Sequence, residues 1–265
     1  MVEVIRVGGV SVAERRSGAE LPAHLSPRPH LHPIRTLGGR VVTDTCPDDH
    51  PWHLGFSFAL QDVDGWNFWG GNTYVRDQGY VAREDHGRIE TGSLTCANEG
   101  FDESLTWWTP HEPLLRETRN TRASRTGPGW QLHVTTTLTN ATARTLSLGS
   151  PATNGRAGAG YGGFFWRLPP AVEPEVFTET AAGEEAVHGS SAPWLAWTDR
   201  GFTLVFANAA DPWFARVDDY PGIGLQLAAT DPILLDPGVS LTRDLHVLIA
   251  DGTLNQSQIN AWKNS

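Results

Sequence analysis

The segment WQLHVTTTLT, residues 130–139, alternates between two faces with a period of two residues. One face carries Trp130, Leu132, Val134, Thr136 and Leu138. The other face carries Gln131, His133, Thr135, Thr137 and Thr139. Because successive side chains of a strand point to opposite sides of a sheet, this pattern predicts a half-buried antiparallel strand.

Similar patterns recur along the chain and predict further strands at residues 2–7, 56–60, 89–97, 104–108, 114–121, 202–206 and 241–249. Residues 140–142 predict a hairpin turn, with residues 144–148 as the returning strand. Asn255, followed three residues later by Gln258, predicts a short capped helix near the C-terminal end. No repeat of fixed length is present, so a propeller is not expected. We therefore expect an all-β fold, a large antiparallel β-sandwich with a short C-terminal helix, as one domain over residues 1–265.

Composition excludes several classes of function. The formal net charge is −10, and no basic stripe is present to bind nucleic acid. No apolar run approaches the roughly 20 residues that a membrane helix needs. The N-terminal residues lack the pattern of a signal peptide, so we expect a cytoplasmic protein with Cys46 and Cys96 reduced. Oligomeric state is left open.

The densest polar cluster lies between Arg28 and His53 and contains four of the ten histidines. These four are His30, His32, His50 and His53. The plainest interpretation is that each imidazole bonds a backbone group in a loop. A second is acid–base catalysis, because imidazole exchanges a proton near neutral pH. A third is a divalent transition metal such as Zn, Mn, Ni or Fe, although no strict ligand spacing is present.

Aromatic residues form a second group, since the chain has eleven tryptophans. Most are expected in the core. A pocket that mixes Trp, His, Asp and Arg nevertheless suits a sugar, because the apolar face of a sugar ring stacks on an aromatic ring while its hydroxyls need polar partners. Residues 153–163 and 178–191 are predicted as long loops, where a β scaffold carries function. Glu117, on a predicted strand, is expected to form a surface ion pair.

The chain also resembles a known family. Segments 28–33, 39–42, 49–55, 67–69 and 86–89, together with Tyr161-Gly162-Gly163 and Arg167, are similar to a bacterial family often labelled "methane oxygenase PmoA-like". Trp52 stands where that pattern commonly has His, and Leu54 where it commonly has Arg, which weakens a multi-histidine metal site. At the level of fold the resemblance extends to galactose mutarotase-like β-supersandwiches, which bind sugars and use His with a carboxylate as acid and base.

These observations predict a carbohydrate-active enzyme of the epimerase, lyase or hydrolase type, with a small sugar or glycoside as ligand. His53 and His32 are the expected acid and base. Six residues are expected to bind substrate: Arg28, His50, Trp69, His86, Tyr161 and Arg167. If a metal is bound, His30, His32, His50 and His53 are its expected ligands. A sugar-binding protein without catalysis and a metal-dependent enzyme, including an oxygenase, remain the alternatives.

Overall fold

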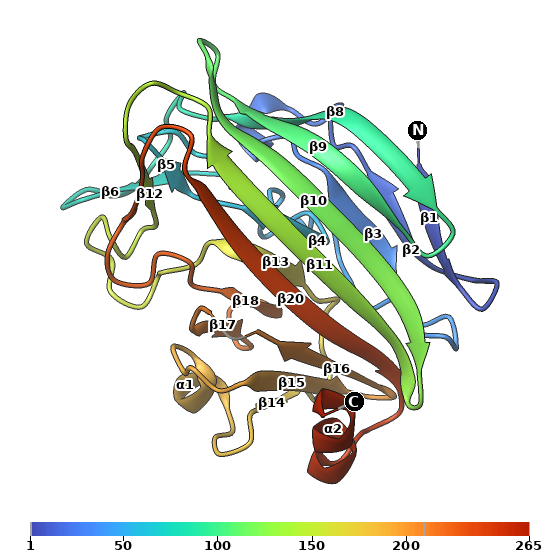
Figure 1. Ribbon diagram of the computed structural model, residues 1–265. Coiled ribbons are helices and arrows are strands. Elements are labelled where there is room, and N and C mark those ends of the chain that lie inside the picture. Colours follow the sequence, from blue (N-terminus) through green and yellow to red (C-terminus); the bar gives the residue numbers. More distant parts are fainter. Residues whose placement is uncertain (1, 209, 265) are drawn as a thin grey trace.

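The computed structural model describes residues 2–208 and 210–264, and most of its strands belong to two facing antiparallel sheets (Figure 1). The first sheet has seven strands, in spatial order β1 (Glu3–Val7), β2 (Val10–Arg16), β3 (His30–Ile34), β4 (Phe56–Ala59), β13 (Gly163–Arg167), β18 (Gly222–Leu225) and β17 (Trp213–Arg216). The second has eight: β14 (Glu175–Phe177), β15 (Trp194–Asp199), β16 (Phe202–Ala207), β20 (Ser240–Asp251), β11 (Gly129–Asn140), β10 (Pro113–Thr126), β9 (Gly100–Trp108) and β8 (Arg88–Ala97). The predicted all-β sandwich is confirmed.

Smaller elements complete the fold. A three-stranded sheet is formed by β19 (Ile233–Leu235), β12 (Leu146–Gly149) and β5 (Asp62–Val63), and a hairpin by β6 (Thr73–Val75) and β7 (Gly79–Val81). The described helices are the 3₁₀ turn η1 (Ala23–Leu25), α1 (Glu184–Val187) and α2 (Gln256–Lys263). The predicted cap at α2 is confirmed, because Asn255 and Gln258 form a reciprocal capping box. None of the described helices has the length and apolar character needed to span a membrane.

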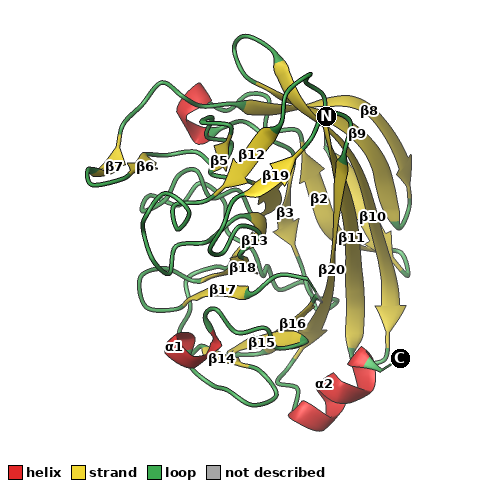
Figure 2. Cartoon of the chain, turned by 60° about the vertical axis from the view of Figure 1, so that its left-hand side comes forward, coloured by secondary structure: helices red, strands yellow, loops and turns green. Residues whose placement is uncertain are grey.

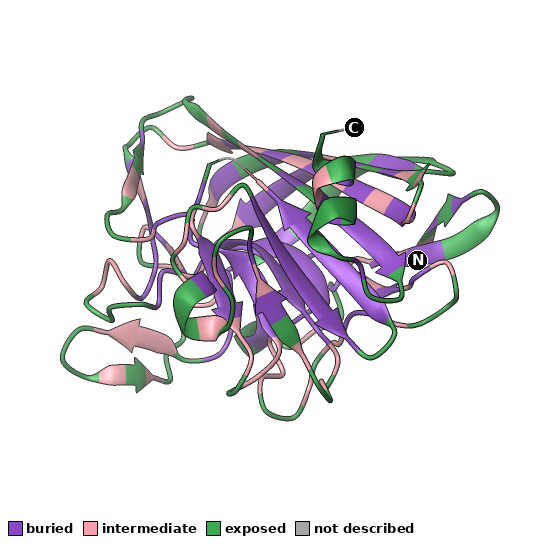
Figure 3. Ribbon diagram, turned by 90° about the horizontal axis from the view of Figure 1, so that it is seen from below, coloured by how far each residue is buried: buried purple, intermediate pink, exposed green. Residues whose placement is uncertain are grey.

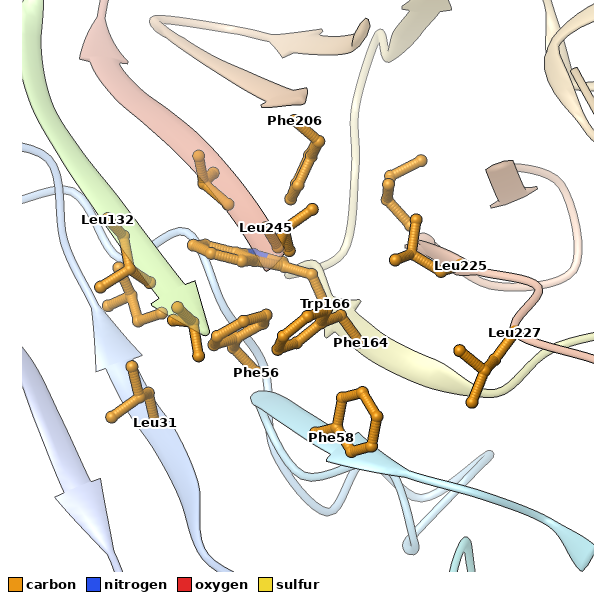
Figure 4. Packing of buried hydrophobic residues seen from close by; sticks show 14 of the residues in the cluster. Leu31, Phe56, Phe58, Leu132, Phe164, Trp166, Phe206, Leu225, Leu227 and Leu245 are labelled. Atoms are coloured by element: carbon orange, nitrogen blue, oxygen red, sulfur yellow. The ribbon is translucent and has the colours of Figure 1, made fainter. Parts of the chain in front are cut away.

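The main core lies between the two large sheets. In Figure 4, Phe56, Phe164 and Trp166 of the seven-stranded sheet point toward Leu132, Phe206 and Leu245 of the eight-stranded sheet. Seen from below in Figure 3, the strands at the centre of the molecule are largely buried, whereas exposed residues are concentrated in loops and at the ends of strands. The alternation predicted for residues 130–139 is borne out, since Trp130, Leu132 and Leu138 are fully buried in this core.

Two local predictions are wrong. Residues 140–142 do not form a hairpin turn, because β11 pairs with β10 and β20, whereas β12 pairs with β19 and β5. The Asn140 side chain donates to the carbonyl oxygens of Arg144 and Leu235, both at 2.7 Å, and so directs the chain away from β11. Glu117 forms the predicted ion pair, with Arg119 at 2.7 Å, but not on the surface. Glu117 is 1% exposed and also accepts hydrogen bonds from Trp107 (2.7 Å) and Thr136 (2.5 Å).

Loops are distributed unevenly over the two sheets. Figure 2 shows many of them gathered near β13, β18 and β17, whereas the long strands β10, β11 and β20 run along the other side of the molecule. The loop predicted over residues 153–163 belongs to this crowded side, and its last residue, Gly163, already begins β13. The loops therefore build up the outer face of the seven-stranded sheet.

Candidate functional site

A cavity of about 510 Å³ opens on the outer face of the seven-stranded sheet. The period of two residues along each strand explains its floor. Phe164 and Trp166 of β13 face the main core, so Phe165 between them faces outward. Phe214 of β17 faces outward in the same way. With Ala59 and Trp69, these two phenylalanines form a separate apolar cluster against which Trp52, Tyr161 and Tyr220 pack.

The cavity is lined by residues from five stretches of chain. They are His50, Trp52, His53, Trp69, Gly70, Asn72, Tyr80, Arg156, Ala159, Tyr161, Phe214, Arg216, Asp219 and Tyr220. Of the residues predicted to bind substrate or to act as acid and base, His50, His53, Trp69 and Tyr161 meet here. The site thus combines aromatic walls with a small number of charged and hydrogen-bonding groups, which is the usual make-up of a small-molecule pocket.

The loop from Pro47 to His53 holds the two pocket histidines. Its turns are closed by His50 N–H donating to the Pro47 carbonyl (3.1 Å) and His53 N–H donating to the His50 carbonyl (2.9 Å). The base of the loop is bonded to β13, because Arg167 N–H donates to the Gly55 carbonyl at 2.8 Å. This arrangement brings the His50 and His53 rings into a parallel stack with centroids 4.7 Å apart.

His53 is buried and electrically neutral. Its ring lies 4.8 Å from that of Phe165 and 5.0 Å from that of Tyr220. Burial lowers its pKa well below the ordinary value, and the positive charges of Arg167 and Arg28, together with that of His50 whenever His50 is protonated, add to this effect. Because the Arg167 guanidinium can only donate, Nδ1 of His53 accepts at 3.4 Å and the ring proton belongs on Nε2. His53 is therefore suited to donate a hydrogen bond rather than to take up a proton.

His50 has the opposite environment. Its Nδ1 lies 2.9 Å from Oδ2 of Asp49, and its side chain is 30% exposed at the edge of the cavity. Arg167 donates to both oxygens of the same carboxylate at 3.0 and 2.9 Å. Burial raises the pKa of Asp49, but hydrogen bonds from His50 and Arg167 outweigh it and leave that pKa below its ordinary value. An ionised Asp49 favours the tautomer of His50 with Nδ1 protonated, which leaves Nε2 as an available base.

Tyrosines supply neutral hydroxyl groups. Burial raises the pKa of Tyr161 and of Tyr220 above the ordinary value, so both stay protonated at neutral pH. The Tyr161 hydroxyl lies 3.0 Å from that of Tyr80, which is carried by the β6–β7 hairpin. The Tyr161 ring also packs on Trp69, with centroids 4.9 Å apart. These groups can donate hydrogen bonds to oxygen atoms of a ligand.

The other predicted site residues support the cavity without lining it. The Arg28 side chain is buried and donates to the carbonyl oxygens of Trp52 and Trp69, both at 2.9 Å, so it fixes two cavity walls. Arg167 orients Asp49, as described above. His86 Nε2 lies 2.8 Å from the Gly71 carbonyl oxygen, and its ring lines a different surface cavity.

His30 and His32 do not join the site. Nδ1 of His30 contacts the Arg28 carbonyl oxygen at 3.1 Å, and the ring borders a small void in the main core. Nδ1 of His32 contacts the Thr43 hydroxyl at 3.0 Å. The expected meeting of His32 with His53 in one pocket is therefore not found. The four histidines named as metal ligands form no common cluster. Within residues 2–208 and 210–264, no three His, Cys, Asp or Glu side chains are grouped to hold a metal ion.

Several lining residues were not identified from the sequence: Tyr80, Arg156, Phe214, Arg216 and Tyr220. Phe214 and Arg216 are two positions apart on β17, so both side chains lie on the same face of the sheet. A strand predicted at this position would have indicated that shared face. Tyr80 and Arg156 come from a hairpin and a loop that meet only in the folded chain, and no local pattern indicates their contact.

Comparison with known proteins agrees with this fold. The model of DUF6807, a family of unknown function, matches residues 3–263, and the chain therefore belongs to that family. No curated protein matches the sequence. These comparisons give no support to the label "methane oxygenase PmoA-like".

Solved structures show the same architecture. A protein provisionally assigned as an aldose 1-epimerase from Escherichia coli K12 superposes with a TM-score of 0.51 at 12% identity, covering 95% of this chain and 99% of that one. A galactose mutarotase-like protein from Lactobacillus casei gives a TM-score of 0.48 at 11% identity, covering 94% of this chain and 100% of that one. The superposition on the Escherichia coli protein shows that this chain shares its fold, a large antiparallel β-sandwich.

Proposed function

We propose that the cavity on the seven-stranded sheet binds a sugar and that His50 transfers a proton on it. The observation that carries the proposal is the presence, in one cavity of about 510 Å³, of aromatic walls together with a carboxylate-oriented imidazole. A cavity of this size suits a small ligand, since such sites span roughly 300–1,000 Å³. The fold shared with the Escherichia coli protein that is provisionally assigned as an aldose 1-epimerase is consistent with a sugar ligand.

The walls suit the two kinds of surface on a sugar ring. Trp52, which is partly exposed, offers an apolar ring surface for its C–H groups, and Trp69 and Phe214, which are 3% and 1% exposed, complete the apolar lining. Tyr161, Tyr220 and Asn72 offer donors or acceptors for its hydroxyls. The Nε2 proton of His53 adds a donor beside these rings. A ligand with one apolar face and a polar edge is therefore matched on both sides.

His50 is the residue best suited to acid–base chemistry. Its Nε2 can accept a proton from a sugar hydroxyl or from a carbon next to a carbonyl group, while Asp49 stabilises the imidazolium that forms. The protonated tyrosines can donate to an oxygen that gains negative charge. Epimerases, lyases and hydrolases all need such a proton-transferring group. In this proposal the acid–base role moves from His53 and His32 to His50, and His53 becomes a hydrogen-bond donor.

Substitution of His50 tests the proposal. Wild-type protein is incubated with a panel of aldoses, uronates and their methyl glycosides, and anomer exchange, epimerisation and bond cleavage are followed by NMR. We expect His50→Gln to lower the rate on the active sugar by about 10²- to 10⁴-fold while sugar binding persists. His133→Gln is the matched control, because His133 also contacts an acidic side chain, Asp244, but lies outside the cavity.

The outcomes separate binding from catalysis. Equal loss of rate in His50→Gln and His133→Gln would show that neither acts at a specific site. Sugar binding without any turnover would remove the acid–base role and leave a carbohydrate-binding protein. If no sugar binds to the wild type, the whole proposal is wrong.

A further inference from the structure

The cavity carries two guanidinium groups for which the proposed sugar chemistry has no use. Arg156 and Arg216 both line it. They come from different elements, Arg156 from the loop before β13 and Arg216 from the end of β17. Nη2 of Arg216 lies 3.4 Å from the Gly158 carbonyl oxygen, so Arg216 is held against the loop that carries Arg156. Two positive charges therefore occupy the same side of the cavity.

Arg216 is fixed in position by its neighbours. Its Nη1 donates to the carbonyl oxygen of the preceding residue, Ala215, at 2.7 Å. The same Nη1 lies 3.0 Å from Nδ1 of His188. Nε2 of His188 lies 2.9 Å from the Gly158 carbonyl oxygen, which assigns the ring proton to Nε2 and makes Nδ1 an acceptor. The guanidinium also lies over the Phe214 ring, 4.6 Å from its centroid. A charge held in this way loses little side-chain entropy when it binds a ligand.

Arg156 has no carboxylate partner among the described residues. Its Nη1 donates to the Tyr80 hydroxyl, and its guanidinium lies 4.9 Å from the centroid of the Tyr80 ring. The Tyr80 hydroxyl in turn contacts that of Tyr161. These contacts hold the guanidinium beside the cavity without neutralising it.

Nearby acidic groups do not cancel both charges. Glu184 lies 3.5 Å from Arg216, and Asp49 is paired with Arg167. Asp219, the acidic residue that lines the cavity, makes no ion pair with either arginine among the residues that the structure describes. Arg156, Arg167 and Arg216 all lower the pKa of Tyr220, against the larger effect of burial, which raises it. Three guanidinium groups therefore act on the Tyr220 hydroxyl.

We infer that the sugar bound in this cavity carries an anionic substituent, a carboxylate or a phosphate, held between Arg156 and Arg216. The inference rests on the proposed sugar-binding function. Guanidinium groups match both anions, because their N–H groups donate two parallel hydrogen bonds. A neutral sugar would leave the charge of Arg156 without a partner. A sugar acid or sugar phosphate satisfies it and keeps the ring on the aromatic walls.

Calorimetric titration at pH 7.5 tests the inference with three probes of the same ring: methyl α-D-glucopyranoside, its uronic acid and its 6-phosphate. The galacto-configured set is run in parallel. Methyl glycosides cannot change anomer, so binding is measured without ring opening. We expect at least one anionic probe to bind on the order of 10- to 100-fold more tightly than the neutral one, as hydrogen bonds to charged groups imply. The preferred anion then distinguishes a sugar acid from a sugar phosphate.

Variants locate the effect. In Arg156→Gln the ratio of anionic to neutral affinity should fall toward one, whereas Arg125→Gln, an exposed arginine outside the cavity, should keep the wild-type ratio. Arg156 is exposed, so its substitution should leave folding intact. Equal affinity of the wild type for neutral and anionic probes of both configurations would overturn the inference and leave sugar binding standing. Failure of every probe to bind would instead overturn the proposed function, and this inference with it.

Discussion

The outer faces of both large sheets carry polar side chains, including a His–Asp pair on each, but these side chains have very different neighbours. On the eight-stranded sheet, hydroxyl groups of neighbouring strands bond each other: Thr137 contacts Thr242 at 2.8 Å, and Thr139 contacts Ser240 at 2.7 Å. On the seven-stranded sheet, loops enclose aromatic rings and leave polar groups facing a cavity. Regular strands pair their polar groups with each other, whereas irregular loops leave groups available to a ligand.

Two His–Asp contacts, one on each face, illustrate this difference between the faces. His133 and Asp244 lie 3.4 Å apart on the eight-stranded sheet, with side chains 40% and 52% exposed. His50 and Asp49 lie 2.9 Å apart beside Trp52 and Tyr220. Both pairs are partly exposed, since the His50 and Asp49 side chains are 30% and 43% exposed, but the second pair shares its carboxylate with the buried Arg167 and borders the cavity. The surroundings, and not the residue types, distinguish the pair for which we propose proton transfer.

The largest effect on stability is expected from Arg28. Its guanidinium donates to four carbonyl oxygens, those of Leu25, Ser26, Trp52 and Trp69. Arg28→Met leaves these buried acceptors without donors, and we expect it to destabilise the fold by roughly 3 kcal/mol or more. Urea unfolding measures this change. The same substitution at Arg122, whose ion pair with Asp102 is exposed, should cost at most about 1 kcal/mol. Equal losses of unfolding free energy in Arg28→Met and Arg122→Met would contradict this distinction between the two faces.

Acid should weaken the fold through the buried histidines of the seven-stranded sheet. Burial lowers the pKa of His30 to about 4 and that of His53 in the same direction. Below pH 6.5 the unfolded chain takes up protons that the folded chain refuses, so stability is highest near neutral pH and falls as pH decreases. Between pH 6.5 and pH 5, His30 alone should account for a loss of roughly 2 kcal/mol.

Urea unfolding at both pH values checks this expectation. His30→Gln should reduce the pH-dependent loss by that amount, although the variant is less stable at neutral pH. His24→Gln, at an exposed position, serves as the control and should retain the full loss. If the free energy of unfolding of the wild type does not change between pH 6.5 and pH 5, then His30 and His53 are not buried in the neutral form.

The smallest effect is expected on the eight-stranded sheet. Thr137→Val removes a hydroxyl from the exposed row but keeps a β-branched side chain that suits a strand. We expect the free energy of unfolding to change by no more than about 0.5 kcal/mol and sugar binding to stay the same. A marked loss of sugar binding in this variant would indicate that the ligand site lies on this face instead.

Sequence patterns predicted the regular face much better than the cavity. Residues 130–139 alternate in a way that only a half-buried strand explains, and that strand is present. The hairpin expected at Asn140 failed because the partner of β12 is decided by tertiary packing, which no local pattern encodes. Glu117 was misassigned for a related reason, since its buried partners Trp107 and Thr136 come from neighbouring strands.

The cavity was predicted only in part. The loop with His50 and His53 was identified because histidines, prolines and tryptophan are concentrated there. His32 is close to His30 in sequence, yet the two rings have separate partners, so proximity along the chain was misleading. Arg156 and Arg216 were missed because their shared position depends on loop closure. Which polar groups face one cavity is a property of the folded loops.

Sugar binding in the cavity is tested most directly by following the imidazole Hε1 resonances of the protein by NMR as a sugar is added. Single substitutions, such as His50→Gln and His133→Gln, assign the relevant signals. The account predicts that the His50 and His53 signals move in a saturable way, while those of His133 and His246 stay in place. Movement of the His133 and His246 signals, with those of His50 and His53 unchanged, would contradict it.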